Sequence, residues 1–139
     1  MKKKFIAGAI LGVVAISIIL AVVLSPDKPG GSGGGGEVGV IYIEGAITCG
    51  RGGGLLGEPR GSEEIAATLR AAAQKPGLKA VVIRLNSPGG SAAAAQEISA
   101  EVERLKKSGK KVVASMGDTA ASAAYWIAAS ADSIVANPG

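Results

Sequence analysis

The chain has 139 residues, no histidine, one cysteine and a formal net charge of +4. Without histidine it cannot build a Ser-His-Asp triad, and one cysteine allows neither an internal disulfide nor the usual ligands of a zinc site. Lys2–Lys4 carry three of the positive charges. From Glu37 onward the sequence has eleven Lys and Arg and ten Asp and Glu, a net charge of +1. The charge of this part of the chain therefore gives no support to nucleic-acid binding.

The first predicted element is an apolar helix over Phe5–Leu24, directly after Lys2–Lys4. This run of 20 uncharged residues spans roughly 30 Å as a helix, the thickness of a bilayer core. A cleaved signal peptide is the alternative, but it has a shorter apolar region and a small-x-small cleavage site, and "AVVLSPDK" offers no clear Ala-x-Ala. We therefore expect a single-pass anchor in the cell membrane, with residues 1–24 starting in the cytoplasm and everything after Leu24 outside.

Residues 25–36 are rich in Gly and Pro and predict a linker, and residues 37–139 then form a domain in which strands alternate with helices. Strands are expected over residues 37–47, 78–86, 110–116 and from 132 onward, and helices over residues 62–74, 91–109 and 119–130. Ser62 and Ser91 are the expected N-caps, and Gly109 ends the second helix. Uninterrupted apolar strands are typical of a parallel sheet covered on both faces, so the fold class is α/β.

Two glycine-rich turns require separate interpretations. "GGGLLG", residues 52–57, matches G-x-G-x-x-G, but no helix opens on its third glycine and no acid follows about 20 residues on, so we interpret it as a surface loop and expect no cofactor. "RLNSPGGS", residues 84–91, lies between a strand and a capped helix. Gly89 and Gly90 let the backbone turn sharply, and the amides there form either an oxyanion hole or a plain strand-to-helix turn.

A single serine, Ser122, stands between alanines in "MGDTAASAAYWIAAS", residues 116–130, just after a valine-rich strand. Ligands collect at the carboxyl ends of parallel strands. Two turns on neighbouring strands would place Ser122 near the amides of Gly89 and Gly90. The pairing makes Ser122 a candidate nucleophile rather than a buried hydroxyl.

The stretches "LNSPGGS", "KKVVASMGD", "AASAAYWIA" and "ADSIVANPG", in this order, resemble the signal peptide peptidase A family of membrane-anchored serine peptidases, from about Glu37 to the last residue. The resemblance implies a Clp protease/crotonase-like ββα spiral, incomplete here at its C-terminus. It also implies that Ser122 is the nucleophile and that the amides of Gly90 and Ala123 bind the oxyanion. We expect Gly89 and Ala124 to contact the substrate.

The sequence departs from the family at three places. Tyr125-Trp126 replaces the family's Tyr-Tyr and keeps the aromatic bulk. Ala123 and Ala124 replace the usual glycines after the serine, which keeps the N–H groups but makes a positive φ costly. The family's general base is a lysine further along the chain, after a Gly-Ser-Ile-Gly stretch, and no residue up to Gly139 occupies that position. The lysines that the domain does contain lie at helix ends or strand starts and are expected to be ordinary surface charges.

Two functions stay open. The first is a membrane-anchored Ser/Lys endopeptidase that degrades remnant signal peptides or other envelope peptides, with the 139-residue chain inactive by itself. The second is a non-catalytic anchored domain that binds peptide or assembles with partners. We favour the first, and expect a homo-oligomer because the family forms rings and so short a sheet leaves one face poorly covered. Small Ala121, Ala123 and Ala124 favour apolar peptides.

Overall fold

The computed structural model describes residues 13–14, 16–17, 37–52 and 61–138. The chain divides into two compact units, Met1–Ser32 and Gly33–Gly139. In the first unit the described residues are helical and exposed, while the rest of the expected anchor and the whole linker lie outside the described residues. Within the described part of the chain, no helix has both the length and the apolar character needed to cross a membrane.

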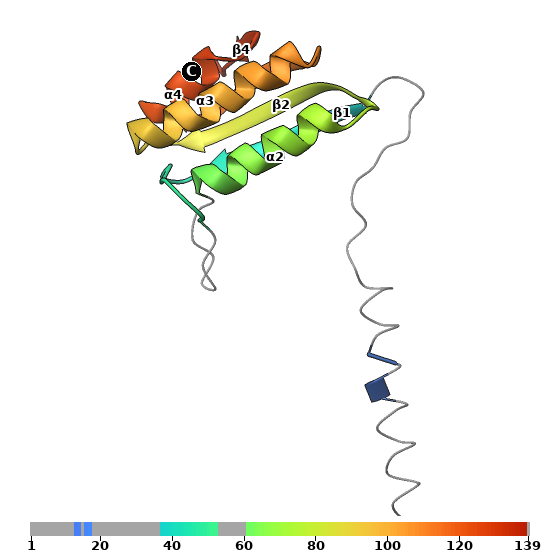
Figure 1. Cartoon of the computed structure of the whole chain (residues 1–139). Helices are drawn as coiled ribbons and strands as arrows, with labels where there is room; N and C mark the ends of the chain where they lie inside the picture. The colour runs from blue at the N-terminus through green and yellow to red at the C-terminus, as the bar shows by residue number, and fades with distance from the viewer. Residues whose placement is uncertain (1–12, 15, 18–36, 53–60, 139) are drawn as a thin grey trace, which may run out of the picture. The chain divides into compact units, whose positions relative to one another are not determined.

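The described residues of the second unit form a four-stranded, fully parallel sheet with strand order β1-β2-β3-β4. Figure 1 shows the helices and strands of this unit in colours that follow the chain. The strands are β1 (Glu37–Glu44), β2 (Leu78–Ser87), β3 (Lys111–Ala120) and β4 (Ser133–Val135), and the helices are α2 (Ser62–Gln74), α3 (Ala92–Lys107) and α4 (Ala123–Ala129). One helix connects each strand to the next, as parallel pairing requires. The predicted parallel α/β sheet is therefore confirmed.

Two details at the element ends differ from the sequence analysis, and one agrees. Ser91 caps α3 by accepting a hydrogen bond from the N–H of Ala94 (3.3 Å). Ser62 is not an N-cap: it lies buried in the first turn of α2, where its hydroxyl accepts from the N–H of Gly50 (3.2 Å). The helix expected from residue 119 begins only at Ala123, because β3 stays paired with β2 up to Ala120 and this pairing outweighs the helical propensity of the alanines.

Helices α2, α3 and α4 all cover the same face of the sheet. That face holds the buried core: Ile41, Ile43, Val81, Ile83, Leu85, Val112 and Ala114 from the strands meet Ile65, Leu69, Ile98, Val102, Leu105 and Ile127 from the helices. On the opposite face Val38, Val40 and Tyr42 are more than half exposed. The expectation of two covered faces is wrong for the described residues. Because strand order never reverses, right-handed crossovers put every connecting helix on one side.

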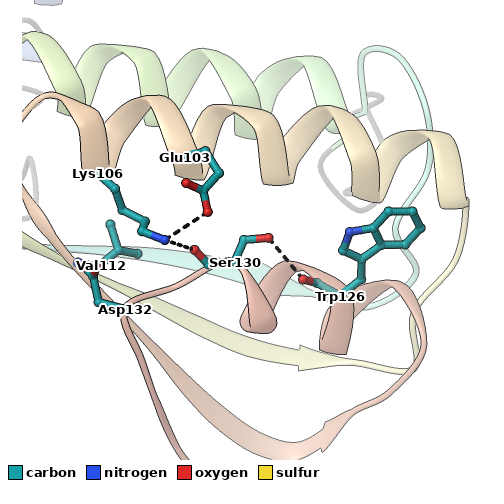
Figure 2. A network of polar contacts seen from close by, with 6 residues as sticks. All are labelled: Glu103, Lys106, Val112, Trp126, Ser130 and Asp132. Atoms are coloured by element: carbon teal, nitrogen blue, oxygen red, sulfur yellow. Dashed lines mark hydrogen bonds and ion pairs between the residues drawn. The ribbon is translucent and has the colours of Figure 1, made fainter.

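Hydrogen bonds fix the end of α4 to α3 and to the start of β3 (Figure 2). The ammonium of Lys106 donates to the backbone carbonyl of Ser130 (2.8 Å), and the Ser130 hydroxyl donates to the carbonyl of Trp126 (3.3 Å). The carboxylate of Asp132 accepts from the N–H of Val112 (2.8 Å). The short helix that follows Ser122 is therefore held at its far end by two other elements.

Candidate active site

Ser122 stands on the turn between β3 and α4. Its φ of 52° makes it the one non-glycine residue with a positive φ among the described residues. It occupies the N-cap position of α4, but its exposed hydroxyl makes no capping hydrogen bond. A side chain in so sparsely populated a conformation costs of order 1–3 kcal/mol and persists only where its surroundings impose it. The turn thus presents an unpaired hydroxyl to solvent.

The turn after β2 lies directly against Ser122. The buried hydroxyl of Ser87 accepts from the N–H of Gly89 (3.0 Å) and shapes the start of this turn. Gly89 has a φ of +99°, and a Cβ there would come within 2.7 Å of the Cβ of Ser122 and of the carbonyl oxygen of Ala121. Only glycine allows this approach, so the sequence "SPGG" is what lets the two turns meet.

Gly90 continues this turn and pairs with Ile47 across a short parallel bridge. The N–H of Ile47 donates to the carbonyl of Gly89 (2.9 Å), and the N–H of Ser91 donates to the carbonyl of Ile47 (2.8 Å). Neither bond involves the N–H of Gly90, which has no acceptor among the described residues. The N–H of Ala123, in the first turn of α4, also has no acceptor there. Two free amides next to a free hydroxyl form a site suited to a developing oxyanion.

The alanines around Ser122 are placed differently from one another. Ala121 is exposed, whereas Ala123 and Ala124 are 3% and 0% exposed and their side chains belong to the core. Gly89 lies at the serine, but the side chain of Ala124 does not face the solvent beside it. The exposed apolar side chains that follow Ser122 on α4 are those of Tyr125 and Trp126, which are 56% and 48% exposed.

A bulge in β3 precedes Ser122. Leu85 pairs with Met116, but Ser87 pairs with Ala120, so β3 carries additional residues opposite Asn86. Bulges of this kind re-aim a strand, and they are common beside active sites.

Two side chains from β2 hold the bulge. Arg84 Nη1 donates to the hydroxyl of Ser115 and to the carbonyl of Met116, both at 2.9 Å. The Asn86 amide oxygen accepts from the N–H of Thr119 (3.3 Å). The sequence analysis assigned no role to Arg84 or Asn86. The available signal was a lone arginine within the apolar strand "LKAVVIRLN".

The lysines of the described residues lie far from Ser122. Lys106 binds the carbonyl of Ser130, about 12 Å from Ser122 along the axis of α4. The ammonium of Lys110 donates to a backbone carbonyl at the end of α2 (2.8 Å). Lys111 opens β3, so the length of that strand, roughly 30 Å, separates it from Ser122. The remaining lysines of the domain also lie at this end of the sheet: Lys75, Lys79 and Lys107.

A serine on a strained strand-to-helix turn, beside free amides and on a parallel sheet, is the arrangement found in α/β serine hydrolases. Comparison with known proteins finds similarity to proteases. The family model of peptidase family S49 matches residues 104–139, which include Ser122. Protease 4 of Haemophilus influenzae is 45% identical over 101 residues, covering 73% of this chain and 16% of that protein.

Two further relatives and one solved structure extend the match. The chloroplastic serine protease SPPA of Arabidopsis thaliana is 36% identical over 108 residues, 76% of this chain and 16% of that protein. A putative protease of Methanocaldococcus jannaschii is 32% identical over 143 residues, 98% of this chain and 46% of that protein. The solved structure is the 1510-N membrane-bound stomatin-specific protease, as a serine-to-alanine mutant; its TM-score is 0.55 at 23% identity over 73% of this chain and 44% of that one.

These matches support a place for the chain in the signal peptide peptidase A family, peptidase family S49. The structural likeness independently supports the α/β fold with its parallel sheet. The chain spans about a sixth of the length of Protease 4 and of the chloroplastic protease, and about half of the Methanocaldococcus protein.

Proposed function

We propose that the chain is part of a membrane-anchored serine endopeptidase, with Ser122 as nucleophile and the N–H groups of Gly90 and Ala123 as the oxyanion hole. The geometry at Ser122 carries the proposal: a positive φ, an exposed and unpaired hydroxyl, and two neighbouring amides with no acceptor among the described residues. The similarity to Protease 4 and to the chloroplastic serine protease SPPA supports it.

The proposed reaction is acyl transfer in two stages. The Ser122 oxygen attacks the carbonyl carbon of the scissile peptide bond while its proton passes to a base. The carbonyl oxygen becomes an oxyanion and accepts hydrogen bonds from Gly90 and Ala123, each of the kind whose loss costs on the order of 10²–10³ in rate. The intermediate collapses, the leaving amine takes the proton, and water then hydrolyses the ester on Ser122.

The base in this proposal is a lysine from outside the described residues. A serine hydroxyl needs a general base, which contributes typically 10²–10⁴-fold, and without histidine a desolvated lysine is the suitable partner. The described lysines lie at the other end of the sheet, with Lys106 and Lys110 engaged by backbone carbonyls. The described residues by themselves therefore offer Ser122 no general base.

The proposed substrates are apolar peptides such as remnant signal peptides. Exposed Tyr125 and Trp126 beside Ser122 offer aromatic surface to apolar side chains. Hydrolysis of charged peptides as fast as leucine-rich ones would argue against this substrate class.

Anchoring and assembly are proposals of their own. The apolar run Phe5–Leu24 supports a membrane anchor, which predicts that the protein stays in the membrane fraction after alkaline carbonate washing; a product starting near Ser25 would contradict it. The exposed face carrying Val38, Val40 and Tyr42 supports homo-oligomers, since apolar surface of this extent is normally covered. Light scattering that shows only monomer at micromolar concentration would oppose assembly.

A non-catalytic, peptide-binding domain is the second candidate. The observation that favours it is the distance of every described lysine from Ser122.

Labelling by a fluorophosphonate probe separates the two functions. The protein expressed from its natural gene is expected to label, and Ser122→Ala to abolish labelling. Ser133→Ala is the matched control, because this hydroxyl is also exposed and has no hydrogen-bond partner among the described residues. Labelling that survives Ser122→Ala would overturn the assignment of Ser122, and an unlabelled natural protein would favour the non-catalytic domain.

A further inference from the structure

A polar pocket opens at the carboxyl end of β3, next to Ser122 along the chain. Its volume is about 420 Å³, and it is lined by Met116, Gly117, Asp118, Ala120, Ala136 and Asn137. The pairing of β3 with β4 ends at Ser115 and Val135, so the two segments part there and the pocket forms between them. Its volume falls within the range of about 300–1,000 Å³ that ligand sites have.

Asp118 supplies the charge of this pocket. It belongs to the bulge of β3, is exposed, and makes no hydrogen bond or ion pair with another described residue. The amide of Asn137 is also exposed and without such a partner within the described part of the chain. Met116 and the alanines add apolar wall. A carboxylate at the end of a partly apolar pocket suits a side chain with an aliphatic stem and a cationic head.

The charges around the pocket reinforce this preference. Residues 85–103 and 112–138, which include the carboxyl ends of β2 and β3 and the starts of α3 and α4, contain no lysine or arginine. Glu44 ends β1 opposite Asn86 and adds a second exposed carboxylate to this edge. Arg84 is the cation nearest in the strand register; it is not among the lining residues, and its Nη1 is bound to Ser115 and Met116.

We propose that this pocket is a specificity subsite for a lysine or arginine side chain of the peptide substrate. The inference rests on the proposed peptidase function and adds a position-specific requirement to the apolar preference. Asp118 precedes Ser122 by four residues, at most about 13 Å of extended chain. The basic residue therefore belongs within about four positions of the scissile bond.

Binding to the Ser122→Ala variant of the natural full-length protein tests the subsite without turnover. The probes are fluorescein-labelled apolar peptides in which lysine, leucine or glutamate is placed at one position at a time. Lysine at the matching position is expected to tighten binding about fivefold over leucine, the upper range for a solvent-accessible ion pair, and high salt reduces the gain.

Substitutions in the Ser122→Ala background assign the effect to the pocket. Asp118→Asn removes the lysine preference, and Asp118→Lys reverses it toward glutamate. Glu97→Gln is the matched control, because Glu97 is an exposed carboxylate on α3 with no partner among the described residues, and it leaves the preference intact. A preference that survives Asp118→Asn, the absence of any preference, or no binding of the lysine peptides up to millimolar concentration overturns the proposal.

Cleavage by the unsubstituted protein keeps the two proposals distinguishable. Cleavage of apolar peptides with no dependence on Asp118 overturns the subsite and leaves the peptidase function standing. Lysine-dependent binding that requires Asp118, in a protein that cleaves none of the peptides, supports the subsite and removes the peptidase function.

Discussion

The two ends of the sheet differ in whether their polar groups have hydrogen-bond or ion-pair partners. At the amino-terminal end, the ammonium groups of Lys106 and Lys110 bind backbone carbonyls, and Lys75 pairs with Glu37. At the carboxyl end, the Ser122 hydroxyl and the Asp118 carboxylate have no partner among the described residues, and the N–H groups of Gly90 and Ala123 have no acceptor there.

The direction of the helices explains this difference. Each helix connects parallel strands and so runs back against them, which brings helix N-termini to the carboxyl end and helix C-termini to the amino-terminal end. Free N–H groups and positive dipole ends accumulate at one end, and carbonyl groups that attract lysine at the other. The same topology therefore leaves free N–H groups at the carboxyl end, beside Ser122, and offers carbonyl groups to lysine side chains at the amino-terminal end.

Substituting one glycine at each end gives the largest expected contrast. A Cβ at Gly90 would overlap the carbonyl of Ile47, whereas Gly109, with a φ of +86°, has open space around it. Gly90→Ala is expected to lower the free energy of unfolding by about 2–5 kcal/mol through overpacking and backbone strain, and Gly109→Ala by about 1 kcal/mol through strain alone.

Thermal unfolding measures both glycine variants. For a domain of this size each kcal/mol shifts the midpoint by about 4–8 °C. Gly90→Ala is also expected to abolish probe labelling at Ser122, and Gly109→Ala to leave it unchanged. Equal shifts in the two variants would show that the turn at Gly90 is not tightly packed.

The sequence was sufficient for the order and type of the elements in the domain, though not for all their ends, and for the meeting of the two turns. Apolar strands separated by capped helices predicted the parallel sheet, and α2 runs over the predicted residues 62–74. "SPGG" and Ser122 were recognised because glycine turns and an isolated serine at strand ends are local signals. The structure brings Gly89 against Ser122, as that pattern requires.

Features that depend on neighbouring strands were not predictable from the sequence. The bulge in β3 exists only relative to the register of β2, so residues 119–121 were assigned to the start of a helix although β3 continues to Ala120. The side chain of Ala124 faces the core because α4 begins at Ala123, a boundary that the alanine run does not mark. One face of the sheet has no helix packed on it because of the strand order, and the hydrophobic periodicity of the sequence does not reveal strand order.

Between the two ends, Glu101 provides a buried charge with a medium expected effect. Its side chain is 4% exposed, and one oxygen binds Arg70 Nη1 (2.7 Å) and Arg104. Glu101→Gln is expected to lower the free energy of unfolding by about 1–3 kcal/mol, because α2 and α3 lose their shared anion and the amide cannot replace the charge. Glu97→Gln, on the exposed side of α3, is the control. If Glu101→Gln lowered the free energy of unfolding no more than the control does, solvation of the two arginines by water would fully replace their bonds to Glu101.

Lys106 tests how much the amino-terminal end contributes to holding α4. Lys106→Met keeps the aliphatic stem and removes the donor to the Ser130 carbonyl, so the expected loss is about 1–2 kcal/mol. Lys107→Met is the matched control, since Lys107 is exposed and has no partner among the described residues. Chemical denaturation measures both variants. Probe labelling is expected to persist in Lys106→Met, and its loss there would mean that the far end of α4 governs the geometry of Ser122.

The smallest effect is expected at the pair of Glu37 and Lys75, which joins the start of β1 to the residue after α2. Both side chains are more than half exposed, so water solvates each charge when the other is removed. Exposed pairs are worth about 0.2–1 kcal/mol, and Glu37→Gln should fall at the lower end of that range and approach zero in 1 M salt, where the Debye length is about 3 Å. Denaturation at low and high salt measures the change. A decrease in the free energy of unfolding above about 2 kcal/mol that persists at high salt would show that this single ion pair holds the amino-terminal end of the sheet. The hydrogen bonds from lysines to backbone carbonyls would then no longer explain why that end is stable.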